Sequence, residues 1–159
     1  FASSLGIKYG IDPSLKMIKV AMRRGIDARP GRGEKIPFPG GSFEYAVIII
    51  TLCFVRNPIK VISEAARVLK PGGKIIIGIV DKKSFLGVYY RNKKSIFYKK
   101  ARFFSVDEVK EILNRAGFKK MIFYQTLSKL PQDLTSIENP RKGYGRCGFV
   151  VISAIKKSG

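Results

Sequence analysis

The stretch ARVLKPGGKIIIGIV, residues 66–80, decides the fold class of this chain. Its first residues have a helical composition, and Pro71, Gly72 and Gly73 then interrupt the helical pattern. Either glycine suits the left-handed residue that commonly ends a helix. Residues 74–80 are almost entirely apolar, which is typical of a parallel strand covered on both faces. The stretch therefore predicts a helix that returns directly into a buried strand.

Toward the amino terminus, the chain continues the same alternation of strands and helices. Residues 6–12, GIKYGID, predict a short strand, and residues 13–25 predict a helix with one apolar face. Residues 26–31 predict a second strand, which is short and weak. Strands that alternate with helices are the building units of a parallel sheet.

The middle of the chain contains the most apolar of the predicted strands. Residues 43–54, FEYAVIIITLCF, predict a strand covered on both faces. Residues 57–70 predict the helix that follows, because Asn57 is a good N-cap and Pro58 fits the first helical position. This helix joins the strand of residues 43–54 to the strand described first.

Two final strands are predicted at residues 119–127 and 147–157, after a helix that Ser105 and Glu108 begin with a capping box. No helix separates these strands, so we expect them to form an antiparallel hairpin at the edge of the sheet. The prediction is a single α/β domain over residues 1–159. It is doubly wound and Rossmann-like, with a mostly parallel sheet and an antiparallel carboxy-terminal edge.

The composition sets limits on the function. Lysine and arginine total 31 against 11 acidic residues, a net charge of +20 that attracts anions, including nucleic acid. No apolar run reaches the roughly 20 residues of a membrane span, and residues 1–12 do not have the pattern of a signal peptide. Cys53 and Cys147 lack metal-ligand spacing, so we expect two free thiols, no metal and a cytoplasmic setting.

Asp12 is the first candidate for a binding residue, because it directly follows a predicted strand. A carboxylate in that position can accept hydrogen bonds from both hydroxyls of a ribose. It can equally cap the helix that opens at Pro13. The spacing alone leaves the two interpretations open.

Three segments resemble successive motifs of class I S-adenosylmethionine-dependent methyltransferases. They are YGIDPSLKMIKVAMRRG (residues 9–25), GEKIPFPGGSFEYAVIIITLCFV (33–55) and EAARVLKPGGKIIIGIV (64–80). The chain is most similar to the small ubiquinone-biosynthesis-type (methyltransferase type 11-like) enzymes, whose Ile-Pro-Phe, Ser-Phe-acid and Arg-Val-Leu-Lys-Pro-Gly-Gly motifs follow here in order. The resemblance implies methyl transfer from S-adenosyl-L-methionine to a small-molecule acceptor.

The resemblance also implies roles for particular residues. Asp12 would bind the ribose of the cofactor, and Pro13 and Met17 would lie near its adenine. Gly33 and Glu34 would contribute backbone contacts to the adenine. Thr51 and Leu52 would border the methionine part of the cofactor and the methyl group that is transferred.

Two departures from the family pattern are visible. Arg32 stands where the family usually has an acidic residue that bonds the adenine amino group. The glycine-rich loop that holds the methionine end, with the strand before it, is missing, and residues 1–5 resemble the helix that follows that loop. We therefore expect a piece of a longer protein with unpaired strand edges, and cofactor binding by this piece stays open.

Residues 82–104 form a basic and aromatic insert with eight lysines or arginines and no acid. It follows the strand that ends at Asp81, where the family builds its acceptor pocket and lid. The insert fits a lid whose tyrosines line the acceptor site, a stacking surface for RNA, or a helix that merely covers the core. The candidates for acceptor contact or a general base are Asp81, Tyr89, Tyr90 and Tyr98, with Tyr144 as a further base candidate.

Direct attack on an activated methyl group needs alignment more than it needs a base, so no catalytic residue is assigned. The long loop of residues 128–146 is a second segment that we expect to close over the acceptor site. One alternative is a basic RNA-binding or RNA-modifying domain with this fold. Another is a nicotinamide-dependent dehydrogenase, against which the RVLKPGG motif argues. The oligomeric state is not predicted.

Overall fold

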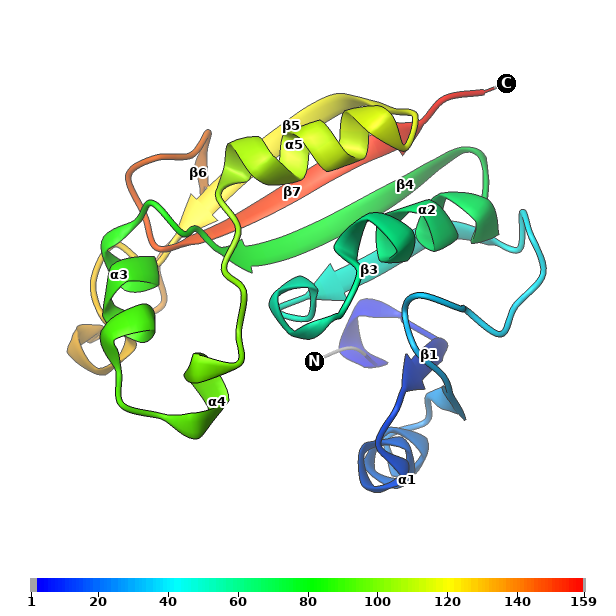
Figure 1. Ribbon diagram of the computed structural model, residues 1–159, viewed down its shortest axis with the longest axis horizontal. Coiled ribbons are helices and arrows are strands. Elements are labelled where there is room, and N and C mark those ends of the chain that lie inside the picture. The colour runs from blue at the N-terminus through cyan, green and yellow to red at the C-terminus, as the bar shows by residue number, and fades with distance from the viewer. Residues whose placement is uncertain (1–2, 159) are drawn as a thin grey trace.

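The computed structural model describes residues 3–158, without the side chain of Phe97, and shows an α/β domain (Figure 1). Of the expected helical segment 1–5, Ser3–Leu5 forms the 3-10 turn η1, and Phe1 and Ala2 lie outside the described residues. The strands are β1 Tyr9–Asp12, β2 Asp27–Pro30, β3 Phe43–Ile49, β4 Leu69–Val80, β5 Phe118–Thr126, β6 Arg141–Lys142 and β7 Phe149–Lys156. The helices are α1 Leu15–Arg23, α2 Pro58–Val68, α3 Phe85–Asn92, α4 Ile96–Lys99 and α5 Val106–Arg115, with 3-10 turns η2 Leu52–Phe54 and η3 Pro131–Asp133.

The strands of the described residues form two sheets. β1 and β2 are a parallel pair, and the larger sheet has the order β3-β4-β7-β5-β6. β3 and β4 are parallel, whereas β7 runs antiparallel to both β4 and β5. The α/β class and the antiparallel carboxy-terminal strands are thus confirmed. β7, the last strand in the chain, lies beside β4, and β5 lies outside it.

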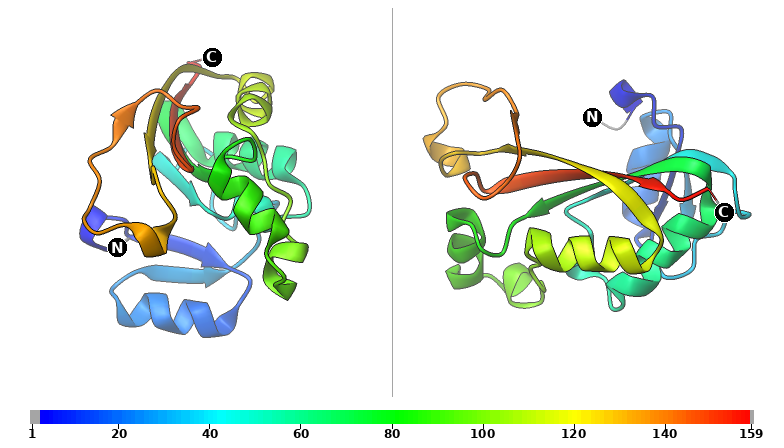
Figure 2. Two further views of the ribbon diagram at one scale, coloured as in Figure 1. Left: turned by 90° about the vertical axis from the view of Figure 1, so that its left-hand side faces the viewer. Right: turned by 90° about the horizontal axis from the view of Figure 1, so that it is seen from above.

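Helices α2 and α5 cover one face of the larger sheet, and the main core lies between them and the strands (Figure 2). Alternate residues of β4 and β7, such as Ile75 and Ile152, are fully buried there. α2 contributes Val61, Ile62 and Ala65 to the same core. Its N-cap is Asn57, whose side chain accepts a hydrogen bond from the backbone of Lys60, as the sequence predicted.

The prediction that β3 is covered on both faces is wrong. Ala46 and Ile48 pack against the core, but Tyr45 and Val47 are 57% and 37% exposed because α2 and α5 lie on the opposite face. The strand also ends at Ile49, and the residues after it turn into η2. Apolar composition therefore overestimated both the burial and the length of this strand.

The helix in the opening stretch ends earlier than predicted. α2 stops at Val68, and Leu69 is already extended and begins β4. Gly72 has a φ of +74°, but it lies inside β4 and not at the helix end. A Cβ atom on Gly73 would lie 2.9 Å from the carbonyl oxygen of Lys70, so this position needs glycine for close packing of the irregular strand.

The capping box of α5 is present as predicted. The Ser105 hydroxyl accepts a hydrogen bond from the Glu108 N–H at 3.2 Å, and the Glu108 carboxylate accepts one from the Ser105 N–H at 2.7 Å. We expect Ser105→Ala to lower the free energy of unfolding by about 1 kcal/mol. Urea denaturation measures this, with the exposed Ser158→Ala as a control that stays within about 0.5 kcal/mol. Equal losses in both variants would contradict the role of the cap.

The amino-terminal elements α1, β1 and β2 have a small core of their own. Ile18, Ile26 and Ala28 form it, with Ala21 packed against them. An aromatic cluster connects this unit to the larger sheet: the ring centroid of Tyr9 lies 5.9 Å from that of Phe38 and 5.7 Å from that of Phe43. The two sheets are therefore joined by side-chain contacts.

Candidate functional site

A cavity of about 570 Å³ lies where the carboxyl ends of β1 and β3 face each other. Its volume is within the roughly 300–1,000 Å³ range of small-molecule pockets. In open α/β sheets, ligands bind beyond the carboxyl ends of the strands. The wall of the cavity consists of Ile11, Asp12, Pro13, Gly31, Arg32, Gly33, Glu34, Ile36, Ala46, Val47, Ile48, Ile50, Thr51, Phe54, Val55, Arg56, Val61 and Ala65.

Most residues predicted to bind cofactor come together in this cavity. Five of the predicted residues line it, and they come from three separate parts of the sequence: Asp12, Pro13, Gly33, Glu34 and Thr51. Met17 and Leu52 are not in its wall. Met17 is 51% exposed on α1. Leu52 is the first residue of η2 and is buried at the neighbouring small pocket.

Asp12 neither caps α1 nor lies free at the end of β1. Its Oδ1 atom accepts a hydrogen bond of 2.7 Å from the Ser14 N–H, and Ser14 is the N-cap residue of α1. Within residues 3–158, no group donates to Asp12 Oδ2. The turn therefore holds the carboxylate in place and leaves one of its oxygens available at the cavity wall.

Glu34 lies in the cavity wall but uses its side chain for the fold. Its Oε1 atom accepts hydrogen bonds from the N–H groups of Arg56 and Asn57, at 3.0 and 3.2 Å. Burial by itself would raise the pKa of Glu34, but these backbone donors outweigh it and lower the pKa below its ordinary value. The Oε1 atom of Glu34 is thus engaged in the fold, and the backbone contact with a ligand stays a prediction.

Glu64 and Arg67 connect two of the sequence motifs. The Arg67 guanidinium donates to both oxygens of Glu64 at 2.8 Å, and also to the carbonyl oxygens of Ile36 and Phe38 at 2.9 Å. Glu64 accepts a further bond from the Ile36 N–H. Its hydrogen bond with Arg67 is the main reason that the pKa of Glu64 falls to about 2. This clamp fixes the Ile-Pro-Phe segment, and with it Ile36 in the cavity wall, onto α2.

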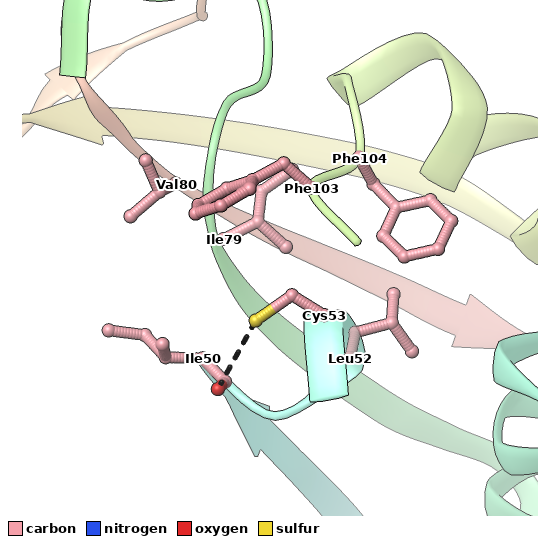
Figure 3. A pocket seen from close by; sticks show the side chains of 7 residues that line it. All are labelled: Ile50, Leu52, Cys53, Ile79, Val80, Phe103 and Phe104. Atoms are coloured by element: carbon pink, nitrogen blue, oxygen red, sulfur yellow. Dashed lines mark hydrogen bonds between the residues drawn. The ribbon is translucent and has the colours of Figure 1, made fainter. Parts of the chain in front are cut away.

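A small apolar pocket adjoins the cavity at the carboxyl ends of β3 and β4 (Figure 3). It has a volume of about 20 Å³, and Ile50 lines both spaces. Ile50 has a φ of 49°, an uncommon conformation for a β-branched residue, and such strain is typical of functional sites. The pocket is lined by Ile50, Leu52, Cys53, Ile79, Val80, Phe103 and Phe104.

Cys53 contributes no reactive group to the small pocket. Its Sγ atom lies 3.7 Å from the Ile50 carbonyl oxygen and donates a hydrogen bond to it. Burial raises the pKa of the Cys53 thiol to about 11, so the thiol stays protonated near neutral pH. The wall of this pocket is therefore apolar, and its thiol supplies neither a nucleophile nor a base near neutral pH.

The residues predicted to contact an acceptor gather beyond the end of β4. The Tyr90 and Tyr98 rings stack with centroids 4.7 Å apart, and Tyr89 contacts Tyr90 edge-on. Asp81 is buried and accepts a hydrogen bond from the Lys83 N–H. None of these four residues lines the cavity or the small pocket. Burial, followed by the neighbouring tyrosines, raises the pKa of Tyr90.

The insert of residues 82–104 folds into the two short helices α3 and α4. Its end reaches the site, because Phe103 and Phe104 line the small pocket. The spacing Tyr89-x-x-x-Lys93, which a dehydrogenase would use as a pair, is present in this insert. The Lys93 amino group lies over the face of the Tyr89 ring, 5.6 Å from its centroid, and no hydrogen bond joins these two described residues.

The loop of residues 128–146 is attached to the sheet and not to the cavity. Residues Arg141–Lys142 form β6 beside β5, and the Tyr144 hydroxyl accepts a hydrogen bond from Lys110. Gln125 Oε1 accepts two backbone bonds from the end of the loop, at Arg146 and Cys147. No residue of the loop lines either space described here.

Sequence reasoning missed several residues of the cavity wall. Arg32 was set aside as a departure from the family pattern, and Ile50 and Arg56 were not singled out. Arg32 and Ile50 adjoin the predicted site residues Gly33 and Thr51 in the sequence, and this adjacency is the signal that identifies them. Arg56 lies four residues after Leu52 and has no such signal. Among the described residues, no cluster of metal-ligating side chains exists, and no helix is long and apolar enough to cross a membrane.

Comparisons with known proteins agree on one family. Residues 2–77 match the methyltransferase-domain family. A Thermotoga maritima crystal structure, described as a SAM-dependent methyltransferase and possible histamine N-methyltransferase, is 45% identical with a TM-score of 0.96. The alignment covers 99% of this chain and 76% of that one.

Two curated relatives extend this result. An uncharacterised protein of Methanocaldococcus jannaschii is 48% identical over 158 residues, which are 98% of this chain and 77% of the relative. The demethylmenaquinone methyltransferase of Lactococcus lactis is 26% identical over 161 residues, and the match covers 97% of this chain and 60% of that enzyme. The chain is thus shorter than the relatives that it matches.

Proposed function

Because the chain belongs to the family of S-adenosylmethionine-dependent methyltransferases, we propose that it transfers a methyl group from S-adenosyl-L-methionine to a small-molecule acceptor. One observation carries the proposal: a cavity of about 570 Å³ brings Asp12, Pro13, Gly33, Glu34 and Thr51 together at the strand ends. Both cysteines are free, which supports the expectation of a reducing, cytoplasmic setting.

The residues of the cavity fit the cofactor chemically. Asp12 Oδ2, which has no donor within the described chain, is placed to accept from a ribose hydroxyl. Gly33 and Glu34 line the same space, where their backbone would contact the adenine ring, and Thr51 lines it as well, where it would border the methionine part. The bound cofactor would supply a methyl group on a positively charged sulfur, which needs no further activation by the protein.

The contribution of the chain would then be alignment and the exclusion of water. Ile50 and Phe54 give the cavity an apolar boundary toward η2. Neither the protonated thiol of Cys53 nor the candidates Asp81, Tyr89, Tyr90 and Tyr98 offers a base in the wall of the cavity. We therefore assign no general base to the reaction.

The names of the relatives point to different acceptors. One is a demethylmenaquinone methyltransferase and another is described as a possible histamine N-methyltransferase, so the acceptor does not follow from the comparisons. The alternative of an RNA-binding or RNA-modifying domain rests on the charge of +20 alone, and none of these relatives supports it.

Calorimetric titration with S-adenosylhomocysteine tests the proposal. We expect micromolar binding by the chain and about tenfold weaker binding by Asp12→Asn. Asparagine retains the acceptor for the Ser14 N–H but removes the charge and the second acceptor oxygen, so the turn survives while the ribose contact weakens.

Asp133→Asn is the matched control, because Asp133 is exposed in η3 and lies outside the cavity wall. Its affinity should equal that of the unchanged chain. Two results would contradict the proposal: no binding by the unchanged chain, or equal affinity of the Asp12→Asn variant and the control.

A further inference from the structure

Three arginines surround η2, the turn that separates the cavity from the small pocket. Arg32 and Arg56 line the cavity, and Arg102 lies beside the small pocket. Within residues 3–158, none of these three side chains takes part in an ion pair. The charge of Arg32 still acts on Glu34, whose pKa it helps to lower, so Arg56 and Arg102 are the arginines without an acidic partner among the described residues. Positive charge of this kind at the wall of a site attracts anions.

The backbone fixes Arg102 at this position. Its N–H donates a hydrogen bond of 2.8 Å to the carbonyl oxygen of Cys53, which belongs to η2. The guanidinium carbon lies 5.0 Å from the centroid of the Phe104 ring, and Phe104 lines the small pocket together with Cys53. The charge of Arg102 is thus held at the rim of an apolar pocket.

The rest of the insert adds charge of the same sign. Lys82 and Lys83 are paired with Glu108 and Asp107 of α5, at 3.3 and 2.9 Å. Lys99 and Lys100, which precede Arg102 by two or three residues, are exposed and form no ion pair among the described residues. Positive charge without an ion pair therefore directly precedes the two residues of the insert that line the small pocket, Phe103 and Phe104.

We propose that the methyl acceptor is a small anion, which carries a carboxylate or phosphate bound by Arg102 and an apolar body that contacts Ile50 and Phe103. This inference rests on the proposed function. A guanidinium binds either anionic group with two parallel hydrogen bonds. The small pocket, at about 20 Å³, is too small to enclose that body. The body would instead lie against its apolar rim at Ile50, which also lines the cavity of about 570 Å³, and Figure 3 shows Phe103 on the opposite side of the pocket from Ile50.

The same charges disfavour an amine that is protonated at neutral pH. Such a cation would approach Arg56 and Arg102 and would share the site with the positive sulfur of the cofactor. The acidic residues of the cavity wall, Asp12 and Glu34, are those that the proposed function assigns to the cofactor. An anion reverses both interactions and is attracted to the sulfur as well as to Arg102. The electrostatics of the site therefore select the acceptor class by charge.

Benzoate and benzylamine are the probes for this proposal, because they share a ring and a size but carry opposite charges. Each is titrated into the ¹⁵N-labelled chain saturated with S-adenosylhomocysteine and followed by NMR. We expect benzoate to bind at least about tenfold more tightly than benzylamine and to shift the amide signals of Cys53 and Phe103. Arg102→Gln should weaken benzoate about tenfold.

Lys119→Gln is the matched control, since it also removes one exposed positive charge. Lys119 is the second residue of β5 and lies in register with Ile155. Ile155 pairs with Lys74, which is far along β4 from the strand end at the site. Its benzoate affinity should change less than about twofold. An equal loss in the two variants would show a general attraction of anions and overturn the proposal, and so would equal binding of the two probes.

Single-stranded RNA provides a further arm of the test. If Arg102→Gln weakens the binding of a mixed-sequence oligonucleotide but not that of benzoate, the arginine recognises a polyanion and the proposal is wrong. S-adenosylhomocysteine binding is read first in the same samples, and benzoate is also titrated without it. Failure of methyl-donor binding is thus separated from failure of anion recognition.

Discussion

Replacing Gly87 with alanine is expected to lower the free energy of unfolding by about 3 kcal/mol. A Cβ atom at this position would lie 2.2 Å from the backbone carbonyl oxygen of Asp81 and 3.0 Å from the Lys82 Cα atom. Both are backbone atoms that no rotamer change can move, so α3 itself must shift. Overpacking of this kind costs about 1–3 kcal/mol, occasionally more, and exceeds the gain of about 1 kcal/mol from the higher helix propensity of alanine.

The shift is resisted on the other side of α3 as well. Leu86 of α3 is fully buried and packs closely against the backbone of Gly148: a Cβ atom on Gly148 would lie only 2.5 Å from the Leu86 Cβ atom. Urea denaturation measures the loss, and the melting temperature should fall by about 6–12 °C. Gly10→Ala is the control, because a methyl group there meets only side-chain atoms, at 3.4 and 4.0 Å. A loss of less than about 0.5 kcal/mol for Gly87→Ala would contradict the steric argument.

Removal of the Glu64 carboxylate is expected to cost about 3 kcal/mol at neutral pH. Glu64→Ala loses one bond from the Ile36 N–H and two from Arg67, each worth about 1 kcal/mol. Arg67 remains near the carbonyl oxygens of Ile36 and Phe38, so the variant also leaves its charge without a counterion. Glu44→Ala is a suitable control, since its ion pair with Lys70 is largely exposed and contributes little.

The clamp also makes stability depend on pH in a defined direction. The pKa of Glu64 is about 2 in the folded chain and lies near its ordinary value of 4.5 in the unfolded chain. Its contribution is complete above about pH 5 and disappears as the pH falls toward 2. The difference in unfolding free energy between the unchanged chain and Glu64→Ala should therefore shrink on acidification. A difference that stays constant from pH 7 to pH 2 would contradict the low pKa.

Local signals in the sequence predicted the elements that local interactions define. Asn57 and Pro58 begin α2, and Ser105 with Glu108 begins α5, because each cap needs only residues within one turn. The pairing of β5 with β7 followed from the absence of a helix between them. The exposure of Val47 was not predictable in this way, because it depends on which face of the sheet the helices cover.

The residues of the candidate site also differ in whether the sequence alone could predict them. Asp12 follows from its position after a strand, whereas Gly33 and Thr51 follow from the resemblance to the methyltransferase family, and all three line one cavity. The sequence contains no local sign that Glu34 bonds the start of α2, or that Arg67 holds a loop about 30 residues away. The position of Arg102 beside η2 is likewise a long-range contact, so only the folded chain identifies it.

The separation of β1 and β2 from the larger sheet has a thermodynamic consequence. Among the described residues, no strand ladder connects the two sheets, and the small core of Ile18, Ile26 and Ala28 stabilises its unit only modestly. Such a unit opens at a lower free energy than the rest of the domain. Because each sheet supplies part of the cavity wall, a ligand bound in the cavity would contact both sheets and hold them together. Binding of a ligand in the cavity would then add to the contacts of Tyr9 with Phe38 and Phe43 that join the two sheets, and a higher ligand concentration would make opening of the amino-terminal unit rarer.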